Sequence, residues 1–370
     1  MHSSSTTGSR RGLGSFFSST PFKALALSTA LFPFHSINAS KTHQYNAVVN
    51  TNTLTVVAVE SPTTVFKEGQ FLHGFGYDLS RQYAKSLNVK LNFKTVKDNA
   101  TALNMVAQGK ANFAMTTASM NTIEKNQLIS FSASCGSDAE LSKNGLNSQL
   151  NWVFKYADDP LAQTASGFIC QSKQTGVTGQ LASFYNRNVV KPESWSTIQR
   201  DLNNRLPIYK ASFKKTAERY DLDWQLLAAI GYQESYLKPN SVSPTGVRGL
   251  MMLTNSTARA MGVTNRVDPV QSIQGGAKYY DLMLSQYEHI PYPDRNWYAL
   301  VAYNMGPGAV NQIQKRLQAQ GKNPNNWVEF YDYLNRNKAS NGRYRQAVQY
   351  VTRIRSYVEH IKTSDRWVDI

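Results

Sequence analysis

The feature that most constrains the fold is a change in the spacing of apolar residues along the chain. Between residues 52 and 132, short strand-like apolar runs alternate with segments of helical spacing, an order typical of a parallel α/β sheet. The expected strands are "TLTVVAVE", "VKLNFKTV" and "ANFAMTTA", and the expected helices are "YDLSRQYAKSL" and "ATALNMVAQGK". From Leu206 onward, nearly every segment has helical spacing. A chain of 370 residues also exceeds one ordinary core, so we expect two domains.

The first 39 residues have the pattern of a secretory signal peptide. Basic residues such as Arg10 and Lys23 precede the apolar run "ALALSTALFPF", and the small residues of "INA" end at Ala39. The apolar run is short for a membrane span, so we predict cleavage, with an uncleaved anchor as the alternative. Export would place the mature chain in an oxidising compartment.

Charge and cysteine usage restrict the partners and cofactors. The formal net charge is +16, from 40 Lys and Arg against 24 Asp and Glu. In an exported protein, this excess suits a cell-wall polymer or an anionic lipid surface better than nucleic acid. Cys135 and Cys170 are the only cysteines and neither belongs to a Cys/His cluster, so we expect no zinc site. Their positions leave open whether they form a disulfide or remain free thiols.

The clearest sign of chemistry is a single carboxylate, Glu234, at the end of an apolar helix. Leu227, Ile230 and Glu234 share one helical face, and no further Asp or Glu follows until Asp268. Burial disfavours the ionised form, so we expect Glu234 to keep a proton that it can donate near neutral pH. Glycoside cleavage needs such a donor, and hydrolases usually add a second carboxylate. Unless a distant carboxylate folds into place, one residue must act first as acid and then as base, with the substrate supplying the nucleophile.

The motifs around Glu234 resemble those of the lysozyme-like lytic transglycosylase domain. "AAIGYQES", "NSVSPTGVRGLMML", "AYNMGPGAV" and "AVQYV" occur in the order and spacing of that family, over roughly residues 206–362. The resemblance implies that Glu234 is the catalytic acid/base. It also implies a set of substrate-binding or supporting residues: Ser243, Gly249, Met251, Tyr303, Asn304 and Tyr350.

The resemblance assigns a contact to each polar member of this set. Ser243 matches a serine that hydrogen-bonds the catalytic carboxyl group or the N-acetyl group of the substrate. Tyr303 and Asn304 match a pair that holds Glu234 and the substrate, and Tyr350 matches an aromatic residue near the catalytic carboxyl group. The alternatives are a turn or cap role for Ser243 and core packing for the two tyrosines.

A second part of the resemblance concerns the loop after Glu234. Gly249 and Met251 match the loop that floors the saccharide cleft. Met252 stands where most relatives have Gln, and Gln346 stands where many have Glu. Both departures put sugar contacts at these two positions in doubt, and both methionines also suit simple packing.

The α/β segment resembles the first lobe of periplasmic solute-binding proteins of the amino-acid type. The matching stretches are "GFGYDLSRQYAKSLNVKLNF", "MVAQGKANFAM" and "NTIEKNQLISFS". After "CGSDAELSKNGLNSQ", the chain returns to features of the first lobe, so a second lobe is missing or vestigial. Lys125 also replaces the arginine that binds the ligand carboxylate in that family, and lysine lacks the bidentate fork. We therefore expect a scaffolding or regulatory remnant that binds no amino acid.

Together, the two resemblances predict the organisation of the whole chain. The expected fold is a one-lobed α/β solute-binding-protein-like domain followed by a mainly α lysozyme-like domain, a pairing known in the membrane-bound lytic murein transglycosylases. The expected boundaries are a signal peptide at 1–39, a truncated solute-binding domain at 52–187, a linker at 188–205 and a lytic transglycosylase domain at 206–370.

The implied activity is cleavage of the β-1,4 bond between N-acetylmuramic acid and N-acetylglucosamine, which leaves 1,6-anhydro ends. The expected partner is the peptidoglycan glycan strand, in the periplasm and with peripheral association at the outer membrane. We expect no nucleic acid, metal or organic cofactor. The alternatives are a muramidase of the same fold that uses water and a wall-bound solute receptor without catalysis.

Overall fold

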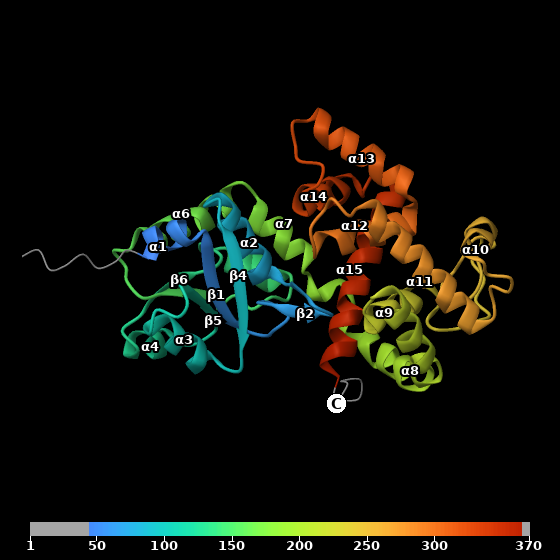
Figure 1. Ribbon diagram of the computed structural model, residues 1–370, viewed down its shortest axis with the longest axis horizontal. Coiled ribbons are helices and arrows are strands. Elements are labelled where there is room, and N and C mark those ends of the chain that lie inside the picture. The colour runs from blue at the N-terminus through green and yellow to red at the C-terminus, as the bar shows by residue number, and fades with distance from the viewer. Residues whose placement is uncertain (1–43, 365–370) are drawn as a thin grey trace, which may run out of the picture. The chain divides into compact units, whose positions relative to one another are not determined.

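The structure, a computed structural model, describes residues 44–364 (Figure 1). The predicted signal peptide at residues 1–39 and the last six residues, 365–370, lie outside this range. Within the described range, none of the helices combines the length and the apolar character that a bilayer span requires.

A five-stranded sheet with the order β4-β1-β5-β7-β6 organises the first half of the chain. β1 (Thr53–Val59) pairs in parallel with β4 (Lys90–Val96) and with β5 (Phe113–Thr116), as the alternation of strands and helices predicts. β7 (Asn151–Phe154) runs antiparallel to both β5 and β6 (Ile129–Ser132). The sheet is therefore mixed: the strands predicted within residues 52–132 are parallel, as expected, and the antiparallel strand β7 comes from residues beyond that range. Periodicity predicts strands, but the direction of pairing depends on contacts between distant segments.

The remaining elements of this half are one hairpin and seven helices. They are β2 (Phe66–Glu68), β3 (Phe71–His73), α1 (Gln44–Thr51), α2 (Phe75–Ser86), α3 (Asn99–Ala107), α4 (Met120–Lys125), α5 (Asp138–Lys143), α6 (Pro160–Gln174) and α7 (Val177–Phe184). On α2, Leu79 and Tyr83 are buried, as the helical spacing predicts, and the Tyr83 ring lies 5.6 Å from that of Trp152 on β7. Between β6 and β7, the chain forms only α5 and its flanking turns, so no second lobe is present there.

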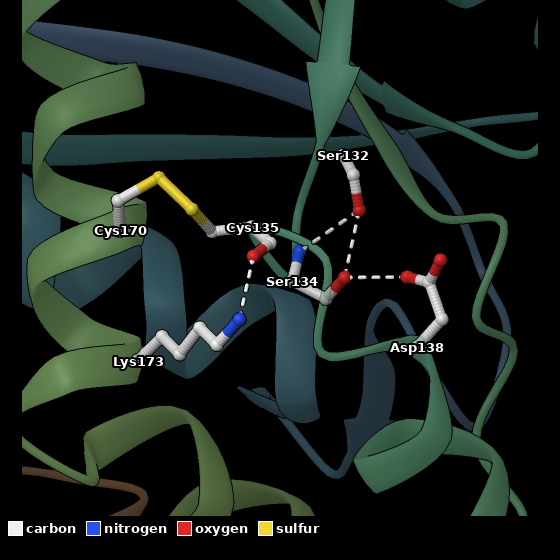
Figure 2. Close-up of a disulfide and its surroundings, with 6 residues drawn as sticks. All are labelled: Ser132, Ser134, Cys135, Asp138, Cys170 and Lys173. Atoms are coloured by element: carbon white, nitrogen blue, oxygen red, sulfur yellow. Dashed lines mark hydrogen bonds between the residues drawn. A yellow bond between two sulfur atoms is a disulfide. The ribbon is translucent and has the colours of Figure 1, made fainter.

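Cys135 and Cys170 form a disulfide, which settles the question that the sequence left open (Figure 2). Cys135 follows β6 in a left-handed backbone conformation with φ 49°, and Cys170 lies on α6. Lys173, one turn further along α6, donates from Nζ to the carbonyl oxygen of Cys135 at 3.1 Å. The disulfide and this hydrogen bond attach the turn after β6 to α6.

We expect the double variant Cys135→Ser/Cys170→Ser to lose about 2–4 kcal/mol of unfolding free energy. The disulfide closes a loop of 35 residues, and opening it restores conformational freedom to the unfolded chain. Urea denaturation of the oxidised protein and of the variant measures the difference. A loss below about 0.5 kcal/mol would show that the link contributes little to stability.

Eight helices make up the second half of the described chain. They are α8 (Pro192–Tyr220), α9 (Trp224–Ser235), α10 (Asn255–Met261), α11 (Pro269–Gln286), α12 (Asp294–Met305), α13 (Pro307–Ala319), α14 (Trp327–Asn337) and α15 (Gly342–Thr363). α15 packs against α9, α12 and α14, so the last helix is central to this half.

The expected linker at residues 188–205 is mostly helical. From Pro192 onward it forms the first half of α8, and Ile198 and Leu202 are buried there. Its polar composition led us to expect only a linker, and an amphipathic helix with a narrow apolar stripe has a similar composition. The chain thus enters the helical half without a flexible break.

The β2–β3 hairpin, α2 and α7 all contact the helical half, and the two halves pack as one compact unit. The Phe71 ring stacks on Tyr292 at 3.7 Å, and Asn296 Nδ2 donates to Glu68 Oε1 at 2.9 Å. Burial, with a smaller effect of nearby Asp223, raises the pKa of Glu68 to about 8, so this carboxyl is mainly neutral at pH 7. A neutral carboxyl can remain in a junction that would exclude a free charge.

Candidate active site

Glu234 lies in the last turn of α9, and the sequence around it explains this position. Asp223 caps the start of the helix, where its Oδ1 accepts from the backbone N–H groups of Gln225 and Leu226. The helix ends at Tyr236, which adopts a left-handed conformation with φ 54°. The Glu234 side chain is half-buried, so one side remains open to a ligand while protein surrounds the rest.

The Glu234 carboxyl group has a direct partner in Tyr350 of α15. The Tyr350 hydroxyl donates to Glu234 Oε1 at 2.6 Å. Burial raises the pKa of Glu234 to about 7, and the hydrogen bond from Tyr350 lowers it by a smaller amount. Burial and the nearby carboxylate raise the pKa of Tyr350 well above its usual value, so this phenol keeps its proton and remains a donor. Near neutral pH, Glu234 is therefore available in both its acid and its base form.

Tyr303 supports the loop after Glu234 rather than the carboxyl group itself. Its hydroxyl donates to the backbone oxygen of Met251 at 3.0 Å, and the Met251 N–H donates to Ser272 Oγ at 3.0 Å. No hydrogen bond joins Tyr303 to Glu234 among residues 44–364, and the role of the Tyr303–Asn304 pair in holding Glu234 and the substrate stays a prediction. Asn304 is half-buried, and its side chain makes no hydrogen bond within the same range.

Met251 itself is fully buried, with 0% of its surface exposed. Its side chain packs against Gly276 of α11, where an added Cβ would lie 2.6 Å from the Met251 Cβ. Met251 therefore supports the loop from below, and it can face a saccharide only through its backbone.

Gly249 gives the loop a conformation that other residues disfavour. Its φ is +90°, and an added Cβ would lie 1.9 Å from the backbone oxygen of Arg266. The Gly249 N–H donates to the Ser241 carbonyl oxygen at 3.1 Å. The loop can approach Arg266 this closely only because position 249 has no side chain.

Ser243 makes a tight turn with its neighbours. Its Oγ accepts from the Val247 N–H at 3.0 Å and lies 3.0 Å from Thr245 Oγ1. Its backbone N–H donates to the Val247 carbonyl oxygen at 2.9 Å. These bonds match the turn role that the sequence left open, and no bond to Glu234 occurs in the described part of the chain.

Ser272 and Tyr279, both on α11, belong to the same arrangement but carried no sequence signal. Ser272 is completely buried under the Met251 backbone, and the Tyr279 ring lies 5.1 Å from that of Tyr303. Each contacts a loop or helix more than twenty positions away in the sequence, so no local spacing could reveal either role. Within residues 44–364, no group of three or more His, Cys, Asp or Glu side chains could hold a metal ion.

The two titrating states of Glu234 predict a pH dependence. Because the acid form is needed to protonate a leaving oxygen, we expect kcat/KM to fall as the pH rises through about 7. Tyr350→Phe removes the hydrogen bond that lowers the Glu234 pKa, so the descending limb of the kcat/KM profile should move to higher pH. The same variant should also lower kcat about 10- to 100-fold, because one charge-assisted hydrogen bond is lost.

Tyr303→Phe is the matched control, since the Tyr303 hydroxyl bonds to Met251 and not to Glu234. It should destabilise the loop and leave the position of the limb unchanged. The assignment fails if Tyr350→Phe does not move the limb, or if Tyr303→Phe moves it equally.

Two family models match the chain, and their matches overlap at residues 211–223. The model described as bacterial extracellular solute-binding proteins, family 3, matches residues 54–223. The model described as transglycosylase SLT domain matches residues 211–326, a range that includes Glu234, the loop and Tyr303. Tyr350 lies beyond the second match.

Several curated proteins to which the chain is similar share one name. Membrane-bound lytic murein transglycosylase F of Stutzerimonas stutzeri is 42% identical over 238 residues, which are 63% of this chain and 48% of the relative. The protein of the same name from Cellvibrio japonicus is 37% identical over 270 residues, 69% of this chain and 53% of the relative. The chain thus spans about half the length of the curated relatives that it matches.

Among solved structures, the 70 kDa soluble lytic transglycosylase Slt70 of Escherichia coli matches with a TM-score of 0.34 and 17% identity. The match covers 54% of this chain and 35% of that one. The family models and the relatives agree: the chain is similar to the membrane-bound lytic murein transglycosylase F proteins, and a stretch that matches the family 3 solute-binding model precedes one that matches the transglycosylase SLT model.

Proposed function

We propose that this chain is a lytic transglycosylase that cleaves the β-1,4 bond between N-acetylmuramic acid and N-acetylglucosamine in murein. One observation carries the proposal: a half-buried carboxyl group, Glu234, has a pKa of about 7 and accepts a hydrogen bond from a buried phenol. In the described residues, no second carboxylate contributes to this pKa. A hydrolase of the usual kind would place a second carboxylate within about 5–10 Å.

The chemistry follows from the two protonation states of one side chain. Protonated Glu234 gives its proton to the glycosidic oxygen as the bond from that oxygen to the muramyl C1 breaks. The 2-acetamido group of the same sugar stabilises the cationic centre. Glu234, now a carboxylate, takes the proton of the muramyl 6-hydroxyl as O6 bonds to C1. Atoms balance without water, and the products are a 1,6-anhydromuramyl end and a free 4-hydroxyl.

The other candidate residues in this scheme orient the Glu234 carboxyl group, hold the loop or bind the sugar. Tyr350 orients the carboxyl group, and Tyr303 with Met251 fixes the loop that would floor the cleft. Asn304 has a side chain without an internal partner in the described range, so its amide is available to a sugar. Ser243 and Gly249 shape the same loop. Nothing in this scheme needs a metal or an organic cofactor.

A substrate change tests this scheme against a muramidase of the same fold. In strands whose muramyl 6-hydroxyl is replaced by hydrogen, no ring can close, so we expect at least about a 10³-fold loss of cleavage. A muramidase would use water instead and would cleave both substrates at similar rates. Comparable turnover of the deoxy and natural strands would therefore refute the proposed reaction.

We also propose that the protein works outside the cytoplasm, at a membrane surface facing murein. The relatives are named as membrane-bound, the formal net charge is +16, and the Cys135–Cys170 disulfide suits an oxidising compartment. We propose removal of residues 1–39 and peripheral attachment to the outer membrane. N-terminal sequencing of the protein from membrane fractions, with and without a high-salt wash, tests both.

A further inference from the structure

The loops on either side of α10 enclose a cavity that the proposed reaction does not use. Its volume is about 440 Å³, within the range of roughly 300–1,000 Å³ typical of small-ligand sites. Three arginines line this arginine pocket: Arg248 of the α9–α10 loop, Arg259 of α10 and Arg266 of the α10–α11 loop. α10 packs on α11, which gives the pocket a fixed base (Figure 1). Within the described residues, neither Glu234 nor Tyr350 belongs to the lining.

Arg248 projects from a backbone that is held on both sides. Its N–H donates to the Leu253 carbonyl oxygen at 3.3 Å, and its carbonyl oxygen accepts from the Leu253 N–H at 3.1 Å. An antiparallel bridge joins it to Val242. The Arg248 side chain is exposed, and its guanidinium group makes no hydrogen bond or ion pair within residues 44–364. All its N–H donors are therefore available to a ligand.

Arg266 and Arg259 each use only one guanidinium nitrogen inside the protein. Arg266 Nη1 donates to the carbonyl oxygens of Leu253 at 2.8 Å and Gly246 at 3.2 Å. Arg259 Nε donates to the Asn255 carbonyl oxygen at 3.4 Å. In the part of the chain that the structure describes, the other nitrogens of both groups have no partner. Each arginine thus keeps two nitrogens for a ligand.

The lining is strongly positive because no acidic side chain balances these arginines. Its members are all described residues, none of them is Asp or Glu, and the formal charge is therefore +3. Asp268 lies one residue beyond the lining, but its Oδ1 caps α11 by accepting from the Gln271 N–H at 2.7 Å. Three like charges around one cavity repel one another, and an anion between them would relieve that repulsion. The pocket thus favours an anionic ligand.

The rest of the lining suits the same kind of ligand. Asn265 Oδ1 accepts from the Val267 N–H at 3.1 Å, whereas its NH₂ group has no partner among residues 44–364. Ala258 and Val263 are buried with Leu253 in a small apolar cluster beneath the loops. An amide donor and an apolar base add hydrogen bonding and limit the access of water, and both strengthen contacts to an anion.

Phosphate matches three arginines better than a carboxylate does. A phosphate monoester carries a charge of about −1.5 to −2 near neutral pH and has three strongly accepting oxygens. Each oxygen can accept from a different guanidinium group, whose planar fork fits phosphate geometry. A carboxylate has one charge and two oxygens, so it would leave at least one arginine of the pocket without a partner.

We propose that the arginine pocket binds a phosphate monoester group. The proposal does not depend on the reaction assigned to Glu234. Soluble phosphate esters and phosphorylated lipid headgroups present the same group, so the experiments below separate the two sources. Arg266 would bind the phosphate while its Nη1 keeps its bonds to the loop that carries Met251, so we leave Arg266 unchanged in the test.

Calorimetric titration of the full chain with sn-glycerol 3-phosphate tests the site. Arg248→Ala/Arg259→Ala should weaken binding about 10- to 100-fold, because two charge-assisted contacts are lost. Succinate, a dianion built from two carboxylates, should bind the wild-type protein at least about 5-fold more weakly than the phosphate ester. Arg259→Ala alone, which leaves the α9–α10 loop intact, should weaken binding about 3- to 10-fold if the double variant does not fold.

The control pair is Arg200→Ala/Arg219→Ala, which removes the same charge from exposed positions on α8, outside the pocket. This pair should leave binding of the phosphate ester unchanged. An equal loss in both pairs would reduce the effect to net charge. No loss in the first pair would exclude the pocket, and equal affinity for succinate would exclude phosphate as the preferred group. Each of these results overturns the proposal.

Sedimentation with vesicles of phosphatidic acid in phosphatidylcholine identifies the source of the phosphate. Phosphatidic acid presents a phosphate monoester at the membrane surface. Weaker pelleting of Arg248→Ala/Arg259→Ala than of the control pair would assign the pocket to a lipid headgroup. Equal pelleting of the two pairs, with binding of the soluble ester lost only in the first, would assign it to a soluble phosphate ester.

Discussion

Replacing Glu234 with glutamine should lower murein cleavage by at least about 10³-fold while leaving the fold intact. Glutamine has the same shape and can still accept the hydrogen bond from Tyr350 through its amide oxygen, so the packing around α9 is preserved. It cannot donate a proton to a leaving oxygen or accept one from the 6-hydroxyl. Release of soluble fragments from purified sacculi measures the rate, and thermal unfolding measures the stability.

The control for this change is Glu218→Gln on the neighbouring helix α8, where the carboxylate is exposed. It removes the same charge and should keep wild-type activity. Substantial activity in Glu234→Gln, or an equal loss in both variants, would show that Glu234 is not the acid/base. A large drop in melting temperature of Glu234→Gln would instead indicate a structural role.

The second large effect is expected for Gly249→Ala. The new Cβ would lie 1.9 Å from the Arg266 carbonyl oxygen. The alanine backbone would also have to adopt a φ of +90°. The Cβ is attached directly to the backbone of residue 249, and the Arg266 oxygen is itself a backbone atom. Because no side-chain rotation can relieve this contact, the loop must move. We expect a loss of roughly 2–5 kcal/mol of unfolding free energy, from overpacking and left-handed strain together. Displacement of the loop that carries Met251 should also lower kcat/KM by about 10²-fold.

Gly246→Ala separates the steric contact from the left-handed backbone strain. Gly246 has a similar φ of +79°, but an added Cβ would meet nothing within 4 Å. This change should cost only about 1–2 kcal/mol through strain and leave kcat/KM near the wild-type value. Equal effects of the two substitutions, by denaturation and kinetics, would show that the contact with Arg266 does not fix the loop.

The parts of the fold that the sequence predicted are those that depend on local spacing. The alternation over β1, β4 and β5 and the face of Leu79 and Tyr83 on α2 follow from burial of one side of each element. The antiparallel pairing of β7 with β5 and the docking of the β2–β3 hairpin onto α12 did not follow, because both depend on partners more than thirty residues away. The helical structure of residues 192–205 was not predicted, because a long helix with few apolar residues has the composition of a polar linker.

At the candidate site, too, local sequence spacing predicted some features, while the hydrogen bonds between side chains could not be predicted from it. A carboxylate on an apolar helical face was enough to predict that the pKa of Glu234 is raised. The hydrogen bonds of Ser243 and Tyr303 could not be read from motifs, because a motif fixes which residue is present but not which atom it contacts. Ser243 bonds within its own turn, and Tyr303 bonds to Met251 across 52 positions. The role proposed for Asn304 remains a prediction, and Gly249→Ala with Gly246→Ala tests the role of the loop backbone.

The most direct test of the central claim is mass spectrometry of the ends that the purified protein leaves on sacculi. We predict muropeptides that end in 1,6-anhydro-N-acetylmuramic acid, each lighter by one water than the corresponding reducing end, and none of them after treatment with Glu234→Gln. Reducing muramyl ends from the wild-type protein would contradict the account, because they would show that water and not the 6-hydroxyl attacks C1.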